Sequence, residues 1–273
     1  MITMNLFTLL ENIPTTPLFD KDTLFFKTSY DTLACSYTVK DIIFESFYIP
    51  PESDYHLISL QDAYSAILFE FTLDQQTHTF YKGPTNHPLP ITYHAGSLYF
   101  QVRIPPIYFL KPILSQPQLF TNKISELSNV IPAFYYFDYP HFKLLNFQEQ
   151  ISYFQAYVGH YIPTQQNHFI NYTLEKSLQP IDAPSLKLIA TELNVSERYI
   201  RNLFKQQLGL TPKDVIQTIR LHQTLSLMLD YDQSITDAYV YANFYDHSHF
   251  NKFFKQQTSY SPTEFKRLIQ QRI

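Results

Sequence analysis

The chain is poor in cysteine, glycine and tryptophan. It has one cysteine, Cys35, four glycines and no tryptophan among 273 residues. A single cysteine excludes an intrachain disulfide and a zinc site made of several cysteines. We therefore expect the protein to work in a reducing compartment, the cytoplasm.

Long apolar runs and export signals are also missing. Prolines and a lysine interrupt the best candidate run, Ile104–Leu114, well short of the roughly 18 apolar residues that a membrane helix needs. The apolar stretch Met1–Asn12 has neither the basic start nor the small-residue cleavage site of a secretory signal. We expect a protein that is neither secreted nor membrane-spanning.

Bulk composition predicts a globular protein of two domains. Hydrophobic residues make up 45% and charged residues 16% of the chain, and its length exceeds that of one small domain. The net charge of −4 is unevenly spread. From Ser185 onward the chain has eleven Lys and Arg residues and eight Asp and Glu residues. Before Ser185 it has nine Lys and Arg residues and sixteen Asp and Glu residues. Any nucleic-acid contact is therefore expected at the C-terminal end.

The first 145 residues or so indicate a strand-rich domain. Prolines separate short β-branched and aromatic runs such as Ser65–Thr72, Ile91–Tyr93 and Ser97–Ile104. The last run alternates apolar residues at period two, which predicts a buried face. From Phe147 the apolar spacing becomes three and four, which predicts helices. We expect domains at 1–163 and 164–273.

The C-terminal part contains one motif twice. The copies run over Ser185–Gln207 and Ser234–Gln257, offset by 49 residues before a central turn and by 50 after it. Each predicts a short helix, a tight turn through Asn194 or Asn243, and a second helix, because asparagine tolerates the left-handed backbone of such turns. The pattern is that of two helix-turn-helix units, at about 185–207 and 234–257.

The residue pattern of each second helix predicts one apolar side and one polar side. Arg, Asn and Lys can pair with base edges or phosphates in a major groove. The candidate DNA-binding residues are Ser196, Glu197, Arg198, Arg201, Asn202 and Lys205 in the first unit, and His247, Ser248, His249, Asn251, Lys252 and Lys255 in the second.

Two further helices are predicted after the units. Thr211-Pro212-Lys213-Asp214 and Ser261-Pro262-Thr263-Glu264 each combine an N-cap hydroxyl, a proline at the first helical position and an acid two residues later. The first of these helices, reaching about Leu229, would be a rigid spacer between the units.

Residues 185–267 resemble the DNA-binding domain of the AraC/XylS family of bacterial regulators. The matching residues are Ala190, Asn194-Val195-Ser196, Tyr199-Ile200, Phe204-Lys205, Gly209 to Pro212, Arg220-Leu221, Ser234 to Asp237, Phe244, Ser248-His249-Phe250, Phe254-Lys255 and Ser261-Pro262. The chain departs from the family with Asn194, Asn243 and Ser259 in place of glycine, and with Tyr239 in place of a small residue. The resemblance implies two helix-turn-helix units on a central helix, each reading a successive major groove.

Two upstream segments show a weaker resemblance to an effector or dimerisation domain of some AraC-type regulators. They are Ser97–Pro106 and the stretch at 119–131, which is expected to be helical.

The expected fold is α+β: an N-terminal strand-rich domain, cupin-like or related, with trailing helices, and a C-terminal all-α domain. The expected partners are promoter or operator double-stranded DNA, with RNA polymerase and a small-molecule effector as candidates, in a homodimer by analogy. Effector-binding residues are not assigned, and no cofactor is expected.

No metal site is expected, because His247 and His249 point to different helix faces without a ligand cluster. Arg103 is expected to form a structural salt bridge, which is favoured over the binding of an anionic effector.

Two rival functions are an N-terminal enzyme with a DNA-binding appendage and a helical protein-interaction module. Residues 1–163 lack a phosphate-binding glycine loop, an HExxH pattern and a nucleophile elbow, so we expect no enzyme. The module would tolerate loss of Arg201 and Lys255, whereas a DNA-binding protein would lose affinity.

Overall fold

A computed structural model describes residues 34–39, 42–106, 108, 116–158, 167–178, 183–229, 246–258 and 260–270. Six antiparallel strands form a sheet in the order β1-β2-β7-β4-β5-β8, and β3 pairs with β6 in a second sheet. The strands are β1 Ala34–Val39, β2 Ile42–Tyr48, β3 Tyr55–Ser59, β4 Ser65–Phe71, β5 Thr77–Lys82, β6 Leu89–Tyr93, β7 Leu98–Ile104 and β8 Ile124–Glu126.

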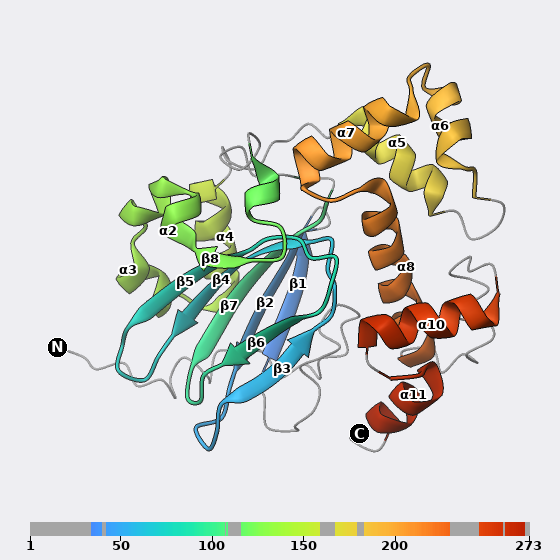
Figure 1. The fold of residues 1–273 in the computed structure, drawn as a ribbon. Helices are drawn as coiled ribbons and strands as arrows, with labels where there is room; N and C mark the ends of the chain where they lie inside the picture. The colour runs from blue at the N-terminus through green and yellow to red at the C-terminus, as the bar shows by residue number, and fades with distance from the viewer. Residues whose placement is uncertain are drawn as a thin grey trace.

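Helices follow the strands and dominate the C-terminal part (Figure 1). They are the 3-10 helices η2 Pro117–Leu119 and η3 Pro132–Tyr136, and the α-helices α2 Leu127–Val130, α3 Tyr139–Leu144, α4 Phe147–Val158, α5 His168–Ser177, α6 Leu186–Glu192, α7 Glu197–Leu208, α8 Pro212–Leu229, α10 His247–Thr258 and α11 Pro262–Gln270. The expected α+β class is confirmed: an antiparallel strand-rich region precedes a helical one.

Strand β7 is the centre of the larger sheet and is buried along its whole length. Its alternating apolar residues predict one buried face, yet the structure buries both, because the sheet is covered on two sides. Helices α2, α3 and α4 lie on one side, and strands β3 and β6 lie on the other (Figure 1). On this second side Tyr93 of β6 packs edge-on against Tyr99 of β7, with ring centroids 5.0 Å apart.

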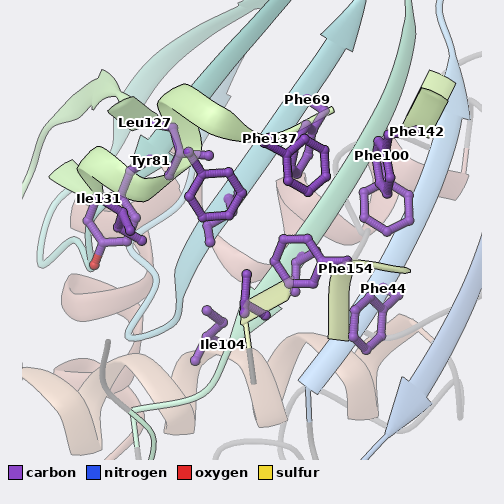
Figure 2. Close-up of a cluster of buried hydrophobic side chains, with 14 of the residues drawn as sticks. Phe44, Phe69, Tyr81, Phe100, Ile104, Leu127, Ile131, Phe137, Phe142 and Phe154 are labelled. Carbon is purple, nitrogen blue, oxygen red and sulfur yellow. The ribbon is translucent and has the colours of Figure 1, made fainter. Parts of the chain in front are cut away.

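An aromatic core joins the sheet to its helical cover (Figure 2). The ring of Phe142 in α3 lies 5.0 Å from that of Phe69 in β4 and 5.1 Å from that of Phe100 in β7. Phe154 of α4 is fully buried beside them. Tilted and edge-to-face pairs of this kind add to the gain from burying the rings. Much of the chain's phenylalanine therefore serves packing.

The helix predicted at 119–131 is wrong for most of that range. Asn122 adopts a positive φ of 59°, which interrupts a right-handed helix. The next residues form β8, whose Glu126 pairs with Phe80 at the edge of β5. Only the single turn α2 and the end of η2 are helical there. This segment forms a strand because it pairs with β5 at the edge of the sheet. Such a pairing partner cannot be recognised from the periodicity of the segment itself.

Helices α4 and α5 pack on different cores. Ile151 and Phe154 of α4 belong to the core of the larger sheet. Ile170 and Leu174 of α5 belong to a second core, formed mainly by α6, α7 and the start of α8. Among the described residues, no helix is both long and apolar enough to cross a membrane.

Candidate nucleic-acid interface

The first predicted unit forms a helix-turn-helix. Ser185 is the N-cap of α6, and its hydroxyl oxygen accepts a hydrogen bond from the Leu188 N–H over 3.3 Å. Asn194 lies in the turn with a φ of 54°, as its residue type predicts. The N–H of Val195 then donates to the carbonyl of Ala190 over 2.9 Å, which closes the turn. Local sequence thus sets the angle at which α7 leaves α6.

Both ends of α7 are capped. Ser196 accepts a hydrogen bond from the Tyr199 N–H over 3.1 Å at the start. Gly209 ends the helix in the left-handed conformation, and its N–H donates to the carbonyl of Lys205. Ser196 was expected in the DNA-binding set, and here its side chain also holds the helix that carries that set.

One side of α7 is buried and the other is open. Ile200, Leu203 and Phe204 pack into the same core as Ile189 and Ala190 of α6. Of the six candidates in this unit, five are exposed and Glu197 is half-buried. Glu197 and Arg201 form an ion pair over 3.1 Å, one helical turn apart. The structure therefore brings the first-unit candidates together on one outer surface.

The second recognition helix, α10, repeats this design. Phe250, Phe253 and Phe254 are buried, at positions that match those of the apolar residues in α7. Of the six candidates in this unit, Asn251 is half-buried and the other five are exposed. The Asn251 amide nitrogen lies 3.1 Å from Nδ1 of His247. In this pair the amide NH₂ is the donor and Nδ1 is the acceptor.

Sequence reasoning missed the cap of α10. The Asp246 carboxylate accepts a hydrogen bond from the His249 N–H over 2.7 Å at the first turn of the helix. An acid just before a helical pattern, three residues from the bonded amide, was the available signal. The predicted first helix of this unit, with Ser234, Tyr239, Asn243 and Phe244, lies outside the described residues, as does Ser259.

The spacer helix and the final helix begin as predicted. Asp214 accepts hydrogen bonds from the N–H and the hydroxyl of Thr211, and the Asp214 N–H donates back to that hydroxyl. Ser261 and Glu264 repeat the same reciprocal box at the start of α11. Helix α8 is described from Pro212 to Leu229 and runs from the first unit toward α10 and α11 (Figure 1).

The C-terminal helical region is similar in sequence to known proteins. A family profile described as "Helix-turn-helix domain" covers residues 189–268. The chain is 31% identical over 78 residues to the HTH-type transcriptional activator RhaS of Klebsiella pneumoniae (strain 342), which is 29% of this chain and 28% of RhaS. It is 35% identical over 91 residues to the HTH-type transcriptional regulator YidL of Escherichia coli (strain K12), which is 33% of this chain and 30% of YidL. The chain thus spans less than a third of these relatives.

Two solved structures were also found to be similar. The C-terminal domain of AraT, a response regulator from Geobacillus stearothermophilus, is 24% identical, with a TM-score of 0.33 over 37% of this chain and 81% of that one. ToxT from Vibrio cholerae is 15% identical, with a TM-score of 0.43 over 85% of this chain and 99% of that one. The profile, the two regulators and the geometry of α6 and α7 show that the chain carries a C-terminal helix-turn-helix domain of the AraC/XylS type.

Proposed function

We propose that this protein is a transcription regulator that binds specific double-stranded DNA by placing α7 and α10 in successive major grooves. The observation that carries the proposal is the repeated helix design: each helix buries three matching apolar residues and exposes Arg, Lys, Asn or His opposite them. Arginine and asparagine can form bidentate contacts with base edges, and lysine can neutralise phosphates. The capped spacer α8 would set the separation of the two DNA elements.

The N-terminal strand-rich region is proposed to control this binding. We keep the division at 163/164 as the proposed boundary between a sensing or dimerising domain and the DNA-binding domain. A small molecule is the proposed input, a homodimer the proposed assembly, RNA polymerase a proposed partner and the cytoplasm the proposed location. The coupling is supported by direct contacts between the N-terminal region and helices α7 and α8, which are described below.

Selection of bound sequences from a random double-stranded DNA pool tests the DNA-binding proposal. The wild-type chain should enrich one motif whose two elements lie about one helical turn, roughly 10 base pairs, apart. Arg201→Ala should relax the preference within one element, with a loss of about 1–3 kcal/mol if it contacts a base. Lys252→Ala should act on the other element or, at a phosphate, reduce the salt slope by about one.

Lys123→Ala is the matched control, because Lys123 is an exposed lysine in the N-terminal region. It should leave both the motif and the affinity unchanged. If all four proteins show the same weak, salt-sensitive binding without a motif, the paired helices are a scaffold for another purpose and the proposal is wrong.

A further inference from the structure

The segment between β3 and β4 contacts the DNA-binding domain directly. Nε2 of His222, on spacer helix α8, lies 2.9 Å from the carbonyl oxygen of Gln61. A carbonyl only accepts, so Nε2 carries the proton and donates. Ala63, two residues further on, is buried in the same core as Ile200 and Phe204 of α7. The 60–63 segment is thus joined to α7 and α8 by a hydrogen bond between residues 161 positions apart and by one packed core.

A second contact lies at the end of recognition helix α7. A Cβ atom added to Gly209 would lie 2.2 Å from the Thr121 hydroxyl oxygen and 3.1 Å from the Pro117 carbonyl oxygen. Contacts this short show that the α7–α8 turn is pressed against the 117–121 segment. Any side chain at position 209 would require this segment to shift, and the positive φ of 72° also favours glycine there.

The 117–121 segment is fixed to the N-terminal sheet. The Gly83 N–H, just after β5, donates to the Lys123 carbonyl over 3.0 Å. The side chain of Asn122 donates to that of Asn86 over 3.0 Å and accepts from the Asn86 N–H over the same distance. A contact made by α7 with 117–121 is therefore a contact with the sheet.

Asp62 ties the other segment to the sheet. Its carboxylate lies 3.0 Å from Nη2 of Arg103 on β7 and 3.7 Å from Nζ of Lys82 on β5. The Tyr64 N–H donates to the other carboxylate oxygen over 2.9 Å. Burial alone would raise the pKa of Asp62, but Arg103, Lys82 and His222 outweigh it and hold the pKa below its usual range. The carboxylate therefore stays ionised at neutral pH.

We propose that residues 60–63 and 117–121 together form a docking platform that fixes α7 and α8 relative to the N-terminal sheet, with Asp62 as its positioning residue. Gln61 and Ala63, which touch the other domain, flank Asp62 in the chain. A change in the surroundings of Arg103 or Lys82 that moves Asp62 must therefore move both contacts. This is the route by which the N-terminal region would act on the first recognition helix, and it rests on the proposed regulatory function.

The test measures the distance between the two parts of the full chain without DNA. Spin labels are placed at Asn129→Cys on α2 and Gln206→Cys on α7, both exposed positions, after Cys35→Ser removes the native thiol. Double electron–electron resonance should give one narrow distribution for this reference protein. His222→Ala and Asp62→Asn should each broaden or shift it, whereas His222→Gln, which keeps a side-chain N–H donor, should broaden it less than His222→Ala.

The matched controls are His87→Ala and Asp74→Asn, which alter exposed residues of the N-terminal region and should leave the distribution unchanged. Circular dichroism checks that each variant is folded. If Asp62→Asn fails to fold, the half-buried His222 still decides the matter. A distribution for His222→Ala identical to the reference overturns the docking platform, and a folded Asp62→Asn with the reference distribution overturns the part assigned to Asp62. Because no DNA is present, either failure is distinct from a failure to bind DNA.

Discussion

The Arg201 guanidinium and the Glu197 carboxylate lie 3.1 Å apart across one turn of α7, in the middle of the proposed DNA-binding surface. The Arg201 side chain is 53% exposed, and the half-buried Glu197 side chain is still 37% exposed. An exposed pair at this spacing contributes only about 0.3–0.5 kcal/mol to stability. Arg201 can therefore exchange Glu197 for a base or a phosphate at little cost.

Glu197→Ala should consequently leave the unfolding midpoint nearly unchanged while it tightens non-specific DNA binding. The variant removes a negative charge beside the DNA and releases Arg201 to meet a phosphate. Fluorescence anisotropy with a random-sequence duplex at several salt concentrations measures both affinity and salt slope. Glu175→Ala, at an exposed position on α5, is the control. Weaker binding by Glu197→Ala would instead mean that Glu197 contacts a base or must orient Arg201.

Two exposed serines near the starts of the recognition helices should differ in their effect on stability. Ser196 caps α7 through the Tyr199 N–H, whereas in α10 the cap comes from Asp246 and Ser248 lies within the first turn. Ser196→Ala should destabilise the protein by about 1 kcal/mol, and Ser196→Asn should retain the cap. Ser248→Ala should change stability by less than about 0.5 kcal/mol. Urea unfolding followed by circular dichroism measures these differences, and equal losses for both alanine variants would contradict this assignment of the caps.

Local signals in the sequence predict the C-terminal domain well. The capping boxes at Thr211 and Ser261 and the left-handed turn at Asn194 depend on neighbours within a few residues, so their residue types are sufficient. Arg103 was expected in a salt bridge, and it pairs with Asp62. The identity of that partner, 41 residues away in the chain, could not be read from local pattern.

Non-local contacts explain what the sequence did not predict. The stretch at 119–131 is expected to be helical, but pairing with β5 draws part of it into a strand. The second covered face of β7 arises from β6, whose contribution no single run of residues reports. The contact between Gln61 and His222 joins the strand-rich region to helix α8 through a backbone carbonyl, which carries no residue-type signal at all.

The buried pair of Asp62 and Arg103 should make stability sensitive to acid. The folded-state pKa of Asp62 lies below its usual value, because the attraction of Arg103 and Lys82 exceeds the effect of burial. Its stabilising contribution is thus complete above the ordinary aspartate pKa of about 4 and is lost as the pH falls below that value toward the folded-state pKa. The urea midpoint of the wild-type chain should therefore fall more steeply than that of Asp62→Asn between about pH 5 and pH 3.

At neutral pH, Asp62→Asn should itself cost about 3–5 kcal/mol, because it leaves Arg103 and Lys82 buried without their counter-charge. Glu175→Gln, which neutralises an exposed acid, should change neither the neutral midpoint nor its pH slope appreciably. Parallel pH profiles for Asp62→Asn and the wild type would show that other carboxylates, and not Asp62, set the acid sensitivity.

Gly209 and Gly96 provide a matched pair for testing the docking platform. Their φ angles are nearly equal, at 72° and 71°, so any substitution adds similar backbone strain at both positions. A Cβ at Gly96 would meet the side-chain end of Leu73, which is exposed and can move. At Gly209 it would meet the Thr121 hydroxyl and the backbone of Pro117. Asparagine tolerates the left-handed conformation better than alanine, so Asn variants isolate the steric effect.

Gly96→Asn should therefore lower the unfolding midpoint slightly and leave the distance between labels at positions 129 and 206 unchanged. Gly209→Asn should displace α7 from the 117–121 segment and broaden or lengthen that distance distribution, because its Cβ would lie 2.2 Å from the partly buried Thr121 hydroxyl and 3.1 Å from the Pro117 carbonyl oxygen. The same measurement with Gly209→Ala should show the same displacement with a larger loss of stability. If Gly209→Asn keeps the reference distance, Gly209 serves only to end α7, and the docking of α7 depends on contacts other than this close approach.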